Sequence, residues 1–126
     1  MRIPIFFLQV SVIIIALAFM TCPVNAQDET RFFENLPDVP MLAGLEELSE
    51  FNISYDKPQG RITESLASIK DNVSNAEIWA FYTATMPQLG WSRINDMTYE
   101  RGEEQLEFKI DSEGGHRFLR VMVRPR

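Results

Sequence analysis

The chain contains 126 residues, with 12 Lys and Arg residues against 18 Asp and Glu residues, so its formal net charge is −6. This length permits a single domain, because domains usually contain about 100–150 residues, and it excludes a multidomain machine or a transporter. The acidic balance argues against general nucleic-acid binding, which requires a strongly basic face.

Residues 1–26 have the composition of a secretory signal peptide. Arg2 is their only charged residue, and an apolar stretch leads into the sequence Val24-Asn25-Ala26. Small side chains at positions −3 and −1 fit a signal peptidase, so we expect cleavage after Ala26 and a periplasmic or secreted protein. Two alternatives stay open. The stretch is long enough for an uncleaved membrane anchor, the one case in which we expect membrane contact, and Cys22 is a candidate lipid acceptor.

Residues 27–50 form an acidic lead-in segment with seven acidic residues and one arginine. Two prolines interrupt any early helix, because proline removes a backbone donor and fixes φ. The i, i+4, i+7 spacing of Met41, Leu45 and Leu48 predicts a short amphipathic helical turn. We therefore expect an extended lead-in that ends in a docked turn, followed by an α+β domain over residues 51–126.

The beginning of that domain predicts two strands joined by a turn. Phe51, Ile53 and Tyr55 alternate with polar neighbours, which is the pattern of a half-buried strand. Residues 61–69 are rich in β-branched side chains, but their apolar positions do not keep one parity. A β-bulge or an edge strand would explain that irregularity.

One amphipathic helix follows. Ser74 and Glu77 have the spacing of a capping box, in which each side chain bonds the other residue's backbone N–H. Pro87 and Gly90 predict the end of the helix near residues 86–89. Its apolar face is expected to carry Ile78, Phe81, Tyr82, Thr85 and Leu89.

The rest of the chain predicts an antiparallel meander with a Gly114-Gly115 hairpin near its end. The expected strands are residues 91–95, 97–101, 105–111 and 117–124. The predicted fold class is α+β, with an antiparallel sheet of about four to six strands and one main helix packed on one face, in the order β-β-α-β-β-β. The helix is expected to pack on Leu106, Phe108, Val121 and Val123.

The sequence FYTATMPQLGW of residues 81–91 resembles a motif of small exported bacterial proteins of unknown function. In that group a helix ends in a Leu-Pro or Met-Pro step and leads into a Gly-Trp strand start. Residues 60–62 and 40–45 are similar to the same group, so the resemblance covers roughly residues 36–125. More loosely, the helix-to-strand order resembles domains of the lipoprotein component of the outer-membrane β-barrel assembly machine, although a lipobox is missing. The resemblance implies a fold and export, and it brings no catalytic residue.

The C-terminal strand is the most distinctive candidate binding element, because it places four arginines in ten residues of an acidic protein. One interpretation is cross-strand pairing with Glu107 and Asp111. Another is a patch for an anionic envelope component or an acidic protein segment. An intermediate interpretation folds the acidic lead-in against this strand. The candidate partner-binding residues are Arg117, Phe118, Arg120, Met122 and Arg124.

The sequence predicts no catalytic, cofactor-binding or metal-binding residue, no cofactor and no enzyme. His116 is the only histidine and lies at the expected hairpin tip, and Cys22 would be removed with the signal peptide. We therefore expect a small exported accessory domain that acts by surface recognition. One alternative is a carrier of a small apolar ligand between helix and sheet, in a pocket lined by Trp79, Trp91 and Phe108. The other, the least favoured, is an enzyme, which would require two or more ionisable groups to converge in a concavity.

Overall fold

The computed structural model describes residues 29–126. The predicted signal peptide, its cleavage after Ala26 and the lipid acceptor Cys22 lie outside the described residues. The elements are β1 (Arg31–Phe32), β2 (Pro40–Met41), β3 (Leu45–Glu47), the 3₁₀ turn η1 (Ser49–Phe51), β4 (Ile53–Lys57), β5 (Gly60–Ile69), α1 (Asn75–Thr85), η2 (Met86–Leu89), β6 (Ser92–Asn95), β7 (Thr98–Arg101), β8 (Glu104–Glu113) and β9 (His116–Pro125). No helix within residues 29–126 has the length and apolar character that a membrane crossing needs.

The α+β class is confirmed, but the expected strand count and order are wrong. The main sheet has seven antiparallel strands, in the order β3–β5–β9–β8–β7–β6, with β4 also paired to β5. The strands β3 and β4 share one edge of β5, because β3 pairs with residues 67–69 and β4 with residues 60–64. The additional strand β3 comes from the lead-in, and β1 and β2 form a separate two-stranded ribbon.

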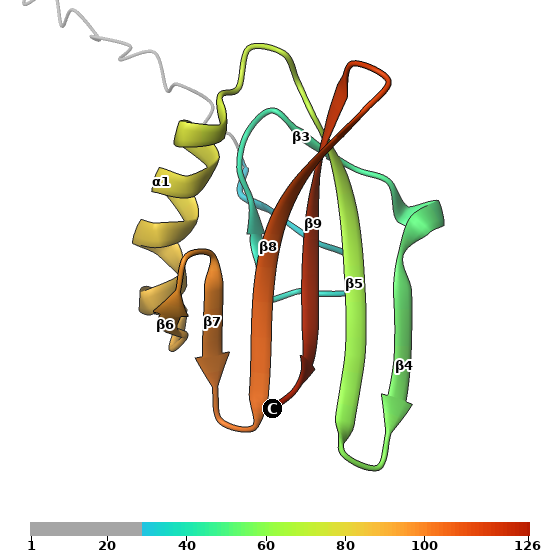
Figure 1. The fold of residues 1–126 in the computed structure, drawn as a ribbon, viewed down its shortest axis with the longest axis vertical. Coiled ribbons are helices and arrows are strands. Elements are labelled where there is room, and N and C mark those ends of the chain that lie inside the picture. The colour runs from blue at the N-terminus through green and yellow to red at the C-terminus, as the bar shows by residue number, and fades with distance from the viewer. Residues whose placement is uncertain (1–28) are drawn as a thin grey trace, which may run out of the picture.

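The helix α1 lies on the β7 and β8 side of the sheet, whereas β4 forms the far edge (Figure 1). The predicted capping box is confirmed, since Ser74 Oγ accepts from Glu77 N at 3.1 Å and the Glu77 carboxylate accepts from Ser74 N at 3.1 Å. Beyond α1 the chain continues as η2. This helical segment ends at Gly90, whose φ of 87° is left-handed. The predicted contact of the helix with the sheet is also present: the ring centroids of Tyr82 and Phe108 lie 4.2 Å apart.

The lead-in and residues 51–126 share one hydrophobic core. Burial raises the pKa of Tyr82, whose hydroxyl donates to the Pro40 carbonyl at 2.9 Å and so ties α1 to the lead-in. The lead-in residues buried in this core are Phe33, Leu36, Val39, Met41 and Leu45.

The helical turn predicted at Met41, Leu45 and Leu48 is wrong. Met41 lies in β2 and Leu45 in β3, and the left-handed Gly44, with φ 94°, turns the chain between them. A Cβ atom on Gly44 would lie 2.4 Å from a methyl group of Val73, so this turn also needs the space that glycine leaves. The helical spacing was misleading because strand pairing, rather than a helix, satisfies this backbone: Met41 pairs with β1 and Leu45 with β5.

The strand β5 corrects the expectation of a bulge or an edge strand over residues 61–69. It is an internal strand of ten residues that pairs with β3 and β4 on one side and with β9 on the other, without a register shift. Its core-facing positions are the small residues Thr63, Ser65 and Ala67, followed by Ile69, whereas Ile62 and Leu66 face the other side. The apolar positions do not keep one parity because small polar residues occupy the core face of β5, and the bulk of the core comes from α1, the lead-in and the C-terminal strands.

Candidate binding surface

The sheet face opposite α1 is open, and it is lined by a mixture of apolar and charged side chains. The register sets Tyr55 beside Ile62, and Leu66 beside Arg120. Side chains that are paired in register project to the same face, so the apolar side chains of β4 and β5 continue into those of β9. The apolar residues of this open face are Ile53, Tyr55, Ile62, Leu66, Phe118 and Met122.

Four of the five candidate partner-binding residues lie together on this open face. Alternation along β9 directs Phe118, Arg120, Met122 and Arg124 to the open side, whereas Leu119, Val121 and Val123 are buried in the core.

Arg117 lies on the opposite side of the sheet. Its guanidinium donates to Asn75 Oδ1 at 2.7 Å and to the backbone carbonyls of Lys70 and Val73. It therefore holds the β5–α1 loop and the start of the helix, and the structure does not bring it together with the other four.

The open-face cations are paired within the sheet. Arg120 lies 2.5 Å from Glu64 and 3.4 Å from Asp111, and Asp111 also lies 3.3 Å from Lys109. Arg124 lies 3.7 Å from Glu107. Cross-strand pairing with Glu107 and Asp111 is thus present, and Glu64 is an additional partner. Any anionic ligand has to compete with these carboxylates for the guanidinium of Arg120.

The lead-in does not pair with the C-terminal strand among the described residues, so the intermediate interpretation is wrong. Asp38 lies 2.6 Å from Arg101, whose guanidinium also packs over the Trp91 ring at 4.2 Å. Glu47 accepts from Glu34 N and from the Asn52 amide. These contacts fasten the lead-in to β7 and to η1, whereas the open-face arginines of β9 pair with carboxylates of β5 and β8.

A cavity of about 630 Å³ opens on this face beside η1. Its apolar lining is Leu48, Phe51, Leu66 and Phe118, and its polar lining is Lys109, Asp111, Ser112, Glu113 and Arg120. Two of the candidate partner-binding residues, Phe118 and Arg120, therefore line this cavity. Its other lining residues were not predicted to bind a partner.

The exposed apolar side chains of β4 and of the adjoining turn η1 are the part of the site that the sequence did not predict. Phe51, Ile53 and Tyr55 were expected to face the core, but their side chains are 58%, 47% and 47% exposed. The strand lies at the sheet edge and α1 lies on the opposite side, so no element covers it (Figure 1). The sequence does carry one signal of an edge strand, since Asp56, Lys57 and Pro58 follow the apolar positions directly.

Side chains pack the region between helix and sheet, where the carrier hypothesis requires a pocket. Trp91 is 1% exposed and Phe108 is 3% exposed, and Tyr82 stacks directly on Phe108. The open-face cavity, and a second cavity of about 740 Å³ beside α1, are both lined by other residues.

The described residues contain no group of three His, Cys, Asp or Glu side chains placed to hold a metal ion. His116 is exposed where the β8–β9 hairpin begins its last strand. No protein-family model matches the chain, and comparison with curated proteins and with solved structures finds no similar protein.

Proposed function

We propose that this protein is a small exported domain of the bacterial envelope that binds an extended segment of a partner protein along β4 and the adjoining open face. The observation that carries this proposal is the exposure of three apolar side chains at alternate positions, Ile53 and Tyr55 on the edge strand β4 and Phe51 in the adjoining turn η1. Natural sheets protect such edges, and contiguous exposed apolar surface is typical of interaction sites.

The backbone of β4 supports strand addition. Its register with β5 is continuous over five residue pairs, from Ile53–Glu64 to Lys57–Gly60. Because β4 pairs with β5 on one side only, the backbone groups on its other side have no strand partner within the described chain. An extended segment that pairs there would gain main-chain hydrogen bonds without disturbing the sheet.

The side chains of the open face supply the second half of the recognition. Alternate side chains of an added strand would project to the same face as Ile53 and Tyr55. The cavity beside η1, with Phe51 and Phe118 in its lining, offers a place for one apolar side chain of the partner. Each apolar side chain that becomes fully buried there contributes about 1.5–3 kcal/mol before the costs of association.

Recognition of an anionic envelope component through Arg120 and Arg124 is the less favoured interpretation. Arg120 already contacts Glu64 and Asp111, so an anion must displace a carboxylate that is held in the same sheet. The apolar interpretation requires no such exchange, because Ile53 and Tyr55 are exposed in the free protein.

Capture from envelope extracts distinguishes the two interpretations. We expect Ile53→Ser/Tyr55→Ser to lose a partner that the wild type retains, while Arg120→Glu/Arg124→Glu keeps it. Ile94→Ser is the matched control, because Ile94 is 45% exposed on the opposite edge strand β6. Equal recovery by Ile53→Ser/Tyr55→Ser and the wild type, with unchanged thermal melts, would contradict the proposal.

A further inference from the structure

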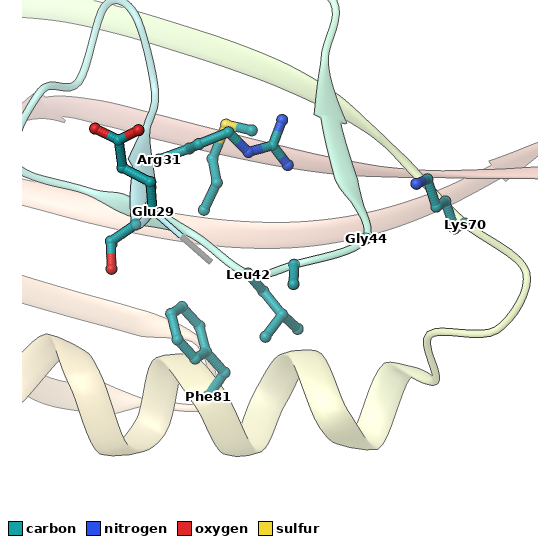
Figure 2. A pocket seen from close by; sticks show the side chains of 9 residues that line it. Glu29, Arg31, Leu42, Gly44, Lys70 and Phe81 are labelled. Atoms are coloured by element: carbon teal, nitrogen blue, oxygen red, sulfur yellow. The ribbon is translucent and has the colours of Figure 1, made fainter. Parts of the chain in front are cut away.

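The second cavity lies on the other side of the molecule from the open face, between α1 and the turn that joins β2 to β3. It has a volume of about 740 Å³. Figure 2 shows Phe81 and Leu42 on the α1 side of this cavity, and the charged ends of Arg31 and Lys70 on the other side. Its lining is Glu29, Thr30, Arg31, Met41, Leu42, Ala43, Gly44, Lys70 and Phe81.

The cations of this cavity differ from most others in the protein. Within residues 29–126, seven of the eleven Lys and Arg side chains form ion pairs with carboxylates. Arg31 and Lys70 belong to the four that do not. Of the remaining two, Lys57 lies over the Tyr55 ring and Arg117 holds the helix start. Two of the four cations without an ion pair among the described residues, Arg31 and Lys70, therefore line the same cavity.

The acidic residue of the lining does not neutralise these cations. Figure 2 shows the Glu29 carboxylate directed away from the Arg31 guanidinium, and no ion pair within residues 29–126 joins Glu29 to either cation. One nitrogen of Arg31 donates to the Leu45 carbonyl at 2.8 Å, which fixes the side chain at the rim and leaves its other N–H groups for a ligand.

We infer that this cavity binds a small amphiphilic carboxylate, with its head group between Arg31 and Lys70 and its acyl chain against Phe81, Leu42 and Met41. Guanidinium groups match carboxylate geometry, and they contribute charge-assisted hydrogen bonds. The volume lies within the range of about 300–1,000 Å³ that small-molecule sites occupy. This inference is independent of the partner site on β4, because none of its residues lines the open face.

The inference is tested by titrating decanoate into the protein obtained by expressing the full chain. The decanoate concentration stays below the value at which micelles form. Amide chemical shifts should move at Leu42, Ala43, Gly44 and Phe81. Affinity should rise about fourfold per methylene from hexanoate to decanoate, which is the effect of burying a methylene group. It should fall as salt increases, because the pairing charges are near the surface.

Three variants locate the site. Arg31→Gln/Lys70→Gln should weaken decanoate binding about tenfold, as expected for two exposed charge pairs. Ala43→Trp fills the cavity from an exposed turn and should abolish binding without changing the core. Arg93→Gln removes a cation on the distant strand β6 and should bind like the wild type.

Ligand controls decide between the free carboxylate and its competitors. Decanol and decyltrimethylammonium should bind at least tenfold more weakly than decanoate. Equal binding of decanol, unchanged affinity in both cavity variants, or shifts confined to the open face would overturn the inference. Binding to anionic phospholipid vesicles without binding to free decanoate would also overturn it, since the site would then recognise a membrane surface. Ile53→Ser/Tyr55→Ser should leave decanoate affinity unchanged, so the two proposals fail separately.

Discussion

Truncation of Phe108 is the sharpest test of the fold, because this side chain joins the helix layer to the sheet. Phe108 is 3% exposed in the internal strand β8, stacked on Tyr82 at 4.2 Å and edge-on to Tyr99 at 6.0 Å. Phe108→Ala should cost about 3–5 kcal/mol of unfolding free energy, which includes the lost transfer energy and the cavity left behind. The total stability of a domain this size is about 5–15 kcal/mol, so the variant should be close to unfolding.

Urea denaturation followed by fluorescence of the buried Trp91 measures this loss directly. The thermal midpoint should fall by at least about 12 °C, because each kcal/mol shifts a domain of this size by about 4–8 °C. Phe51→Ala is the matched control, since Phe51 is 58% exposed, and it should change the free energy by less than about 0.5 kcal/mol. A Phe108→Ala cost below about 1 kcal/mol, or one equal to the control, would refute the placement of α1 on this strand.

Three further variants test contacts that the fold depends on, each by chemical denaturation. Leu36→Ala should destabilise the protein by about 2–5 kcal/mol, because this lead-in residue is fully buried, whereas a dispensable linker would show no change. Arg117→Gln should cost about 0.5–1.5 kcal/mol through the hydrogen bonds that it removes at the helix start, and a cost no larger than that of Arg124→Gln would contradict this role. Ser74→Ala should cost about 0.5–2 kcal/mol by removing the cap; an unchanged midpoint would show that the cap does not hold α1.

The elements that the sequence predicts well are those set by local chemistry. The capping box of Ser74 and Glu77 is a contact between residues three apart, and the left-handed Gly114 and Gly115 join β8 to β9 as expected. Strict alternation along β9 was sufficient to place Phe118 and Arg120 on one face, since a strand has a period of two.

The errors come from contacts between distant parts of the chain. The lead-in enters the core through its pairing with β5 and through the Tyr82 hydroxyl, and neither partner is near it in sequence. The strand β4 alternates as a half-buried strand would, but burial depends on which element covers it, and none does. Arg120 and Glu64 are 56 residues apart in the sequence, so no local pattern predicts that they pair.

Arg117 shows the limit of reading a site from composition alone. Four arginines close together in an acidic chain allowed the interpretation of one basic patch with Arg117 as a member, but alternation directs Arg117 to the core side, where it bonds the β5–α1 loop. Arg120 and Arg124 lie on the open face beside carboxylates of neighbouring strands. The pairing of this segment with Glu107 and Asp111 was therefore predictable from the sequence, whereas the pairing of Arg120 with Glu64 was not.

Photocrosslinking in living cells tests the central proposal about β4 most directly. A benzophenone side chain placed at Tyr55, and in a separate strain at Ile94, samples two edge positions of similar exposure on opposite sides of the sheet. We expect a discrete covalent adduct with another protein from position 55 and none from position 94. Adducts of the same identity and yield from both positions, or adducts from position 94 alone, would contradict it.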